Sequence, residues 1–126
     1  MSDLSPFRGQ PYLNLETYKR SGQAVPTPVW FVEHEDHLYV RTIAYSGKVK
    51  RVRNNPQVRV APCDARGELL GEWSAGQARV ASPEKSAAVN QLLGRKYGLR
   101  KRLFDLMNAL RRTPWVVIEI ELNGSV

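Results

Sequence analysis

The sequence predicts an α+β protein, an antiparallel β-barrel with short helices at its rim. Two observations lead to this prediction: six stretches of β-forming residues arranged mostly as hairpins, and a helical insertion before the last of them. A doubly wound parallel sheet would instead need a helix after most strands. The 126 residues contain no internal repeat and no linker, so we expect a single domain over residues 1–126.

The predicted strands alternate apolar with polar residues or are rich in β-branched and aromatic residues. They span residues 12–18, 24–32, 37–43, 57–62, 72–81 and 115–122. Residues 1–10 are expected to form an N-terminal arm. Pro26 and Pro28 have no amide hydrogen to donate, which places their strand at an edge or a bulge, or leaves its backbone free for a ligand.

Three helices are predicted between or beside these strands. Ser46 is a plausible N-cap for a short helix that the NNP sequence of residues 54–56 ends. Ser82 caps a second helix, which Gly94 and Gly98 are expected to break. A third helix is predicted over residues 99–110, with Leu103, Leu106, Met107 and Leu110 on one stripe.

The net charge of +7 favours anionic partners, which include nucleic acids, phosphorylated small molecules and acidic membrane surfaces. The chain has one cysteine, Cys63, and therefore no internal disulfide. A reducing, cytoplasmic setting is the simplest interpretation. The first ten residues lack the apolar run of a signal peptide, and no stretch is apolar enough to span a membrane.

Side chains for metal binding or for acid–base chemistry are sparse. His34 and His37 lie at an acidic hairpin tip and are interpreted as solvated, while Cys63 ends an apolar strand and is interpreted as a buried, inert thiol. Glu119 and Glu121 fall on the same side of the last strand, where solvent is the default. If the protein is an enzyme, we therefore expect a cofactor to carry the chemistry.

The stretch from Tyr45 to Val60 contains five cations and no acid. Lys48 falls in the first turn of a helix, where a cation is unfavourable unless an anion lies nearby. Arg51 follows three residues later and could reach the same phosphate. A plain solvated basic helix remains the alternative interpretation of this stretch.

Three segments together resemble the FMN-binding split-barrel superfamily, which includes pyridoxamine 5′-phosphate oxidase. They are PTPVWF (26–31), LYVRT (38–42) and GKVKRVRNNPQVRVAPCDARG (47–67), and the likeness extends over roughly residues 12–122. Within the superfamily the chain is most similar to the PPOX-class oxidoreductases that use the deazaflavin coenzyme F420. The resemblance implies a six-stranded split barrel that forms a homodimer, with the cofactor in a groove at the dimer interface.

The resemblance also implies which residues bind the cofactor. The flavin-like ring would rest along residues 25–30, and Thr42, Ser46 and Lys48 match the phosphate-contacting positions. The full expected set is Pro26, Thr27, Pro28, Val29, Thr42, Ser46, Gly47, Lys48, Lys50, Arg51, Pro62 and Cys63. Gly47 stands where the oxidase branch has an arginine, which favours F420 over FMN. No catalytic side chain and no metal ligand is implied.

The sequence thus predicts an oxidoreductase that transfers a hydride between F420, or alternatively FMN, and a small-molecule substrate. The alternative is an FMN-binding or haem-binding protein on the same fold that does not turn over. A nucleic-acid binder would also suit the charge, but no nucleic-acid-binding motif is present. We therefore expect a homodimer with neither a nucleic-acid nor a membrane partner.

Overall fold

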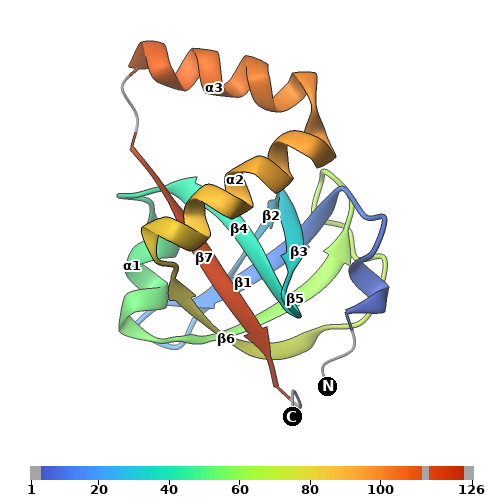
Figure 1. Ribbon diagram of the computed structural model, residues 1–126. Coiled ribbons are helices and arrows are strands. Elements are labelled where there is room, and N and C mark those ends of the chain that lie inside the picture. The colour runs from blue at the N-terminus through green and yellow to red at the C-terminus, as the bar shows by residue number, and fades with distance from the viewer. Residues whose placement is uncertain (1–3, 112–113, 124–126) are drawn as a thin grey trace.

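A computed structural model describes residues 4–111 and 114–123 of the chain. Its centre is one antiparallel sheet (Figure 1). The strands are β1 (Tyr12–Tyr18), β2 (Ala24–Val29), β3 (Phe31–His34), β4 (His37–Ile43), β5 (Gln57–Cys63), β6 (Ser74–Val80) and β7 (Trp115–Leu122). Their order in the sheet is β2-β1-β5-β6-β7-β4-β3. The α+β fold class predicted from the sequence is confirmed.

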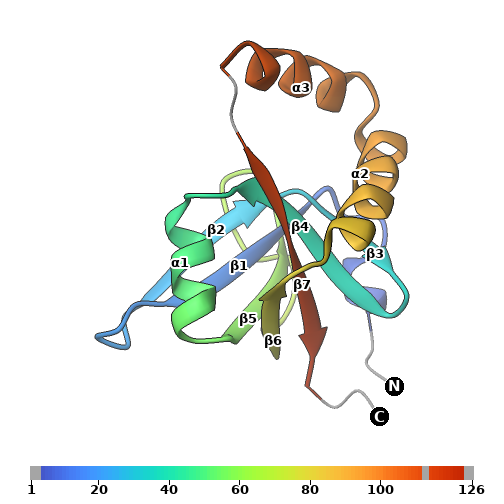
Figure 2. The same ribbon diagram turned by 60° about the vertical axis from the view of Figure 1, so that its left-hand side comes forward.

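The sheet curls into a split barrel because β2 and β3 follow each other in the chain yet lie at opposite ends of the strand order. Trp30 is the single residue between them, so the two edges of the sheet approach each other there (Figure 2). The expectation of six strands is therefore wrong in one place. The run predicted as one strand over 24–32 is two strands, since the chain leaves β1 at Val29 and pairs with β4 from Phe31.

Strand β2 lies at an edge, which is one of the arrangements that its two prolines allow. It pairs only with β1 in the strand order, with Pro28 opposite Asn14 and Pro26 opposite Glu16. A proline is tolerated at an edge because no second neighbour needs its missing amide hydrogen. The outer side of this backbone is consequently left for contacts outside the sheet.

The barrel interior is filled by alternate residues of the strands, among them Leu13, Leu15, Leu38, Val40, Val60, Ile118 and Ile120. The N-terminal segment adds to this core instead of forming a separate arm. A 3₁₀ turn at Ser5–Phe7 buries Phe7, whose ring meets that of Phe31 edge-on with centroids 6.1 Å apart. The arm predicted over residues 1–10 thus contributes Leu4 and Phe7 to the core, and residues 1–3 lie outside the described ranges.

Helix α1 (Gly47–Asn54) begins where the sequence predicts. The Ser46 hydroxyl accepts a hydrogen bond from the Val49 amide and so caps the first turn. Val49 and Val52 are buried against the barrel, and burial of each contributes about 1.5–3 kcal/mol. The helix is therefore held by its apolar side, while its basic residues Lys50 and Arg53 are exposed.

Helices α2 (Pro83–Tyr97) and α3 (Leu99–Arg111) form the insertion before β7. Ser82 caps α2, as expected, but Gly94 does not break it. A single glycine costs a helix only about 1 kcal/mol, and the buried side chains of Leu93 and Tyr97 hold this turn on the barrel. Gly98, at φ +57°, ends α2 and turns the chain into α3, which stands off the barrel in Figure 1.

Glu119 of β7 is buried, which contradicts its predicted place in solvent. Its side chain is 2% exposed and accepts hydrogen bonds from Tyr39, His37, Arg79 and Lys85 over 2.6–3.0 Å. The physical reason is that α2 covers this part of the outer face of the sheet, bringing Lys85 against it. His37, predicted to be solvated, is accordingly part of a charge network.

Within the described ranges, no helix is both long and apolar enough to cross a membrane. Likewise, no group of three or more His, Cys, Asp or Glu side chains in those ranges could hold a metal ion. His34 forms an ion-pair contact with its neighbour Glu35, with 3.5 Å between Nε2 and Oε1. The cavities of the molecule are therefore the places to look for a functional site.

Candidate functional site

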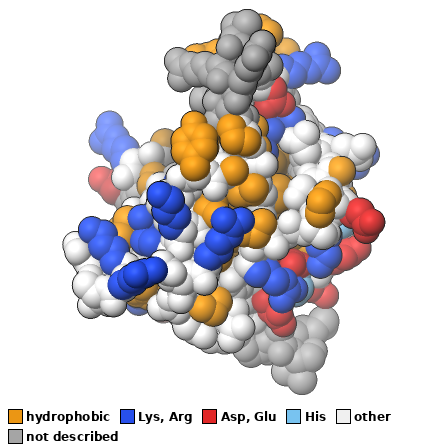
Figure 3. Space-filling view, turned by 90° about the vertical axis from the view of Figure 1, so that its left-hand side faces the viewer, with side chains coloured by type: hydrophobic (Ala, Val, Ile, Leu, Met, Phe, Trp, Pro, Cys, Tyr) orange, Lys and Arg blue, Asp and Glu red, His pale blue; other side chains and the backbone are white. Residues whose placement is uncertain are grey.

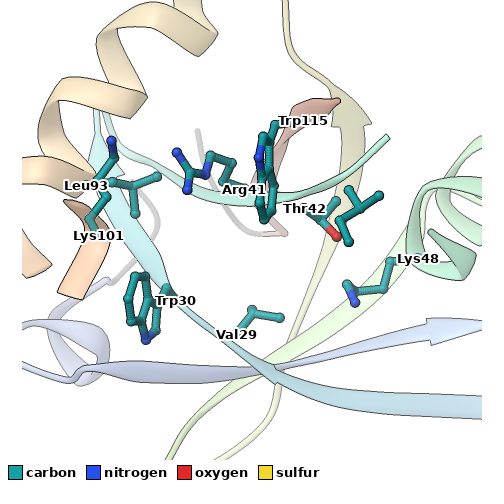
Figure 4. Close-up of a pocket in the computed structure, with 9 residues that line it drawn as sticks. Val29, Trp30, Arg41, Thr42, Lys48, Leu93, Lys101 and Trp115 are labelled. Carbon is teal, nitrogen blue, oxygen red and sulfur yellow. The ribbon is translucent and has the colours of Figure 1, made fainter. Parts of the chain in front are cut away.

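A cavity of about 250 Å³ opens between the end of β2, strand β4, helix α1 and the α2–α3 insertion (Figure 4). Its walls are mainly apolar and aromatic, with cations at several points. The lining residues are Val29, Trp30, Arg41, Thr42, Ile43, Lys48, Leu93, Lys101 and Trp115. No acidic side chain of the described ranges lines it. Such a lining suits a flat, apolar group that carries negative charge at its ends.

Two tryptophans shape the cavity. The Trp30 ring stacks on Tyr97 with centroids 4.2 Å apart and planes inclined by 7°. The Tyr97 hydroxyl in turn bonds to the Phe31 backbone and donates to the Pro11 carbonyl at 2.7 Å. Trp115 is covered on one side by the Arg41 guanidinium, 4.5 Å from the ring centre. Both indoles are thus held in fixed orientations by neighbours on other elements.

At one end of the cavity, α1 presents a polar corner. The hydroxyls of Thr42 and Ser46 lie 3.3 Å apart. Lys48 lies on the same side of the cavity as Thr42 in Figure 4. Ser46 and Lys48 come from the start of α1, where unpaired backbone amides and the helix dipole favour an anion. Two hydroxyls, a cation and a helix start together resemble the donors that bind a phosphate.

Lys48 has no hydrogen-bond or ion-pair partner among the described residues. Burial lowers the pKa of its ammonium group below the usual value, and the nearby Arg51 lowers it further. An unpaired, desolvated cation is costly, since nothing compensates for the lost hydration. An anion bound beside Lys48 would remove that cost, and this is the strongest electrostatic signal in the cavity.

The Arg51 side chain is oriented differently from the expectation that it converges with Lys48. Its Nε atom donates to the Thr17 hydroxyl at 2.6 Å, which ties α1 to β1. A Cβ atom at Gly47 would lie 2.6 Å from the Arg51 guanidinium, so the glycine leaves room for this arrangement. Arg51 therefore affects Lys48 through its charge, which lowers the pKa of Lys48, while Lys50 is exposed on α1.

Three of the twelve expected cofactor-binding residues line the cavity: Val29, Thr42 and Lys48. Ser46 adjoins it through Thr42, and Pro26, Thr27 and Pro28 run along β2 toward its Val29 end. Thr27 and Val29 share a side of β2, since they pair with Leu15 and Leu13. Pro28 lies on the other side, beside Gly67.

Pro62 and Cys63, also expected at the cofactor, do not line this cavity. Both are buried on β5, where Cys63 pairs with Tyr12 and Pro62 with Leu13. Burial, with the charge of Asp64, raises the pKa of the Cys63 thiol to about 11. The raised pKa agrees with the interpretation of Cys63 as an inert thiol. Neither Pro62 nor Cys63 is assigned a role in the cavity.

Six lining residues were not in the expected set: Trp30, Arg41, Ile43, Leu93, Lys101 and Trp115. Leu93 and Lys101 come from the insertion, and its path over the barrel cannot be read from local sequence patterns. Arg41 had a usable signal, because it is a lone cation inside the apolar strand β4. Trp30 and Trp115 flank strand ends, where aromatic residues are common for many reasons.

The surface over α1 supports the same interpretation. In Figure 3, Lys and Arg side chains border a central group of hydrophobic side chains on this face. Lys50 and Arg53 of α1 are exposed, as is the apolar Tyr45 just before the helix, at 65%. An apolar centre bordered by cations suits an aromatic, anionic ligand better than a neutral one.

Neither a family model nor a curated protein matches the chain at a significant level. Solved structures do match. A haem storage protein from Vibrio cholerae is 14% identical with a TM-score of 0.71, over 94% of this chain and 85% of its own. A putative pyridoxamine 5′-phosphate oxidase from Listeria innocua is 17% identical with a TM-score of 0.62, over 96% and 90%. An F420 reductase is 15% identical with a TM-score of 0.61, over 98% and 97%. These likenesses show the split-barrel fold that the sequence resemblance implied.

Proposed function

We propose that this protein is an oxidoreductase that binds a deazaflavin or flavin in the cavity and transfers a hydride to or from a small molecule. The observation that carries the proposal is the unpaired, partly buried Lys48 at the end of a cavity walled by Trp30 and Trp115. Coenzyme F420 is the proposed cofactor and FMN the alternative. The F420 reductase and the putative oxidase on the same fold add support.

The residues present fit such a cofactor. Lys48, with the Thr42 and Ser46 hydroxyls, would hold a phosphate, while Val29 and the indoles would contact the ring. When bound, the cofactor supplies the hydride chemistry itself. The chain's part is to orient the ring and to exclude water from its face, which the apolar lining favours. No side chain is assigned the role of acid or base.

The size of the cavity supports the predicted homodimer. Pockets that enclose a drug-sized ligand usually hold roughly 300–1,000 Å³, and this one holds about 250 Å³. One chain would therefore enclose only part of a flavin, and a second copy would complete the site. A cytoplasmic location and the absence of nucleic-acid and membrane partners remain predictions.

The alternative is a protein that binds FMN or haem without turnover. Its haem form can be compared with the proposal through the residues that line the cavity. Haem iron is usually held by His, Cys, Met or Tyr, and none of these lines the cavity within the described ranges. This favours a flavin over haem. The V. cholerae haem storage protein, however, has the same fold, so haem belongs among the ligands to be tested.

The test is a side-by-side titration of the purified protein with F420, FMN, FAD and haem by isothermal calorimetry. F420 or FMN should bind saturably, and Lys48→Ala should weaken binding by about ten- to a hundredfold, since a charged hydrogen bond contributes about 1.5–3 kcal/mol. Lys50→Ala is the matched control and should bind normally. Equal affinity in both variants would contradict the phosphate role of Lys48. A second assay offers the protein with bound reduced cofactor to a panel of hydride acceptors. Oxidation of the cofactor by an acceptor indicates an enzyme, and no oxidation indicates a storage protein.

A further inference from the structure

Asp105 of α3 lies between two cations. Its Oδ1 atom accepts a hydrogen bond from Arg41 Nη2 at 2.6 Å, and its Oδ2 atom accepts one from Lys101 Nζ at 2.5 Å. The side chains of Arg41 and Lys101 are only 13% and 11% exposed, whereas that of Asp105 is 36% exposed. The cations are therefore built into the structure, and the carboxylate that neutralises them is the accessible member of the group.

The same two cations line the cavity proposed for the cofactor. In Figure 4, Lys101 lies on the side of the helical insertion and Lys48 on the side of α1. The cavity thus has a cationic group at each of two separate places. One of them, at Lys48, has no partner among the residues that the structure describes, and the other is neutralised by the carboxylate of Asp105.

Arg41 would keep its orientation without Asp105. Its Nη1 atom donates to Asn90 Oδ1 at 2.7 Å, and its guanidinium lies over Trp115. Two contacts from separate elements therefore hold the arginine fork in place. Such a prearranged fork binds carboxylates and phosphates alike, because both present paired oxygen atoms.

Lys101 connects the cavity to a second, basic pocket. This pocket, of about 530 Å³, lies at the corner of α2 and α3, where Arg95, Lys101 and Arg102 line it. No acidic side chain of the described ranges is part of its lining. An anion that reached Lys101 would therefore meet further positive charge beyond it.

We propose that Arg41 and Lys101 form a second anion subsite of the cofactor cavity, and that Asp105 occupies this subsite until a ligand carboxylate or phosphate replaces it. The inference rests on the proposed function for the identity of the ring-bearing ligand. The replacing group belongs either to the cofactor's tail or to an anionic substrate. Asp105 is a competitor within the chain, so it weakens the binding of ligands that need the subsite and leaves other ligands unaffected.

The first experiment uses malonate, a dicarboxylate without a ring, with the wild type, Asp105→Asn and Asp36→Asn. Asp36 is an exposed hairpin residue at φ +63°, where Asn is tolerated, so this control makes the same change in charge and chemistry. Malonate should bind Asp105→Asn about tenfold more tightly than either other protein. Adding Arg41→Gln to Asp105→Asn should abolish this gain. Equal binding to all three proteins would overturn the inference.

A second experiment keeps the inference testable if Asp105→Asn does not fold. In the wild type, malonate should shift the NMR signals of Arg41 Nε and of the Asp105 carboxyl before those of Arg53, an exposed arginine of α1. Uniform shifts at the two arginines would count against the subsite.

The source of the anion is distinguished with F420 and FMN. If the cofactor tail uses the subsite, Asp105→Asn should gain about tenfold in F420 affinity over Asp36→Asn, with little change for FMN. If a substrate uses it, malonate should bind together with either cofactor. Failure of both cofactors to bind, with malonate still selecting Asp105→Asn, would refute the proposed function and leave the subsite standing. Normal cofactor binding with no selective effect of malonate or F420 would refute the subsite alone.

Discussion

The Tyr39 hydroxyl donates a hydrogen bond to the Glu119 carboxylate over 2.6 Å. Around this contact, His37, Arg79 and Lys85 complete a network beneath the start of α2. Burial and the neighbouring carboxylate raise the pKa of the Tyr39 hydroxyl, which therefore stays protonated as a donor. Helix α2 carries Leu93 of the cavity, so the network positions part of the proposed site.

Glu119→Gln should destabilise the fold by about 1.5–3 kcal/mol at neutral pH, because the hydrogen bonds from Tyr39, His37, Arg79 and Lys85 lose their charged acceptor. Burial alone would raise the pKa of Glu119, but the bonds from Tyr39, His37, Lys85 and Arg79 outweigh it and lower the pKa. Because its pKa is lowered, the Glu119 carboxylate stabilises the folded state at pH values above 4.5, the ordinary pKa of a glutamate. This stabilisation is lost as the pH falls from 4.5 toward the lowered pKa. Urea unfolding across this range should show the two proteins converging in acid. Glu121→Gln is the control, and a similar loss there would contradict the prediction.

Anion binding at Lys48 should take up protons at alkaline pH. The pKa of Lys48 is lowered in the ligand-free protein, and a bound phosphate favours the charged ammonium and raises it. Cofactor affinity should therefore fall as the pH rises through the lowered pKa. Calorimetry in buffers with different ionisation enthalpies measures the uptake directly. The arginine of Lys48→Arg stays charged, so this variant should bind the cofactor without taking up a proton. Proton uptake that persists in this variant would mean that a group other than Lys48 is protonated on binding.

Cys63 should resist alkylation in the folded protein. Its thiol is fully buried and its pKa is raised to about 11, so very little thiolate exists near neutral pH. Iodoacetamide at pH ~8 should modify the native chain slowly and the urea-unfolded chain quickly, as followed by mass spectrometry. If cofactor binding leaves the rate of alkylation of the native protein unchanged, Cys63 is separate from the cavity. A native thiol that reacts quickly, and that the cofactor protects, would instead show that Cys63 contacts the cofactor.

The apolar side of α3 should contribute to the proposed homodimer. Leu103 and Leu106 are each 61% exposed, and their burial against a second copy would contribute about 1.5–3 kcal/mol apiece. The double change Leu103→Ser and Leu106→Ser should therefore weaken dimerisation by a hundredfold or more, as measured by sedimentation equilibrium. Cofactor affinity should fall with it. Arg100→Ser, a change at an exposed residue of the same helix, should affect neither dimerisation nor cofactor affinity. A wild-type protein that is monomeric with cofactor bound would contradict the proposal.

Local sequence was sufficient for most of the fold. Alternation in 12–18 and 115–122 predicts β1 and β7 with the observed bounds, because successive side chains of a strand point to opposite faces of the sheet. Ser46 and Ser82 mark their helix starts, because a hydroxyl before the first turn satisfies amides that the helix cannot. In each case the determining interaction spans only a few residues.

The site could be predicted only in part, for the same reason. Thr42, Ser46 and Lys48 lie within seven residues, so their approach was readable from a strand followed by a capped helix. Lys101 and Arg41 are sixty residues apart, and their meeting over Asp105 depends on where the insertion crosses the barrel.

The sequence by itself determined most of the strands, the caps of α1 and α2, and the closeness of Thr42, Ser46 and Lys48 at the start of α1. Only the tertiary structure decided that one predicted strand divides at Trp30, that Glu119 is buried, and that Asp105 neutralises two cavity cations. Local patterns report each residue's own backbone preference and which side of its element is apolar. Burial of a charge depends on which distant element covers it, and that is set by packing of the whole chain.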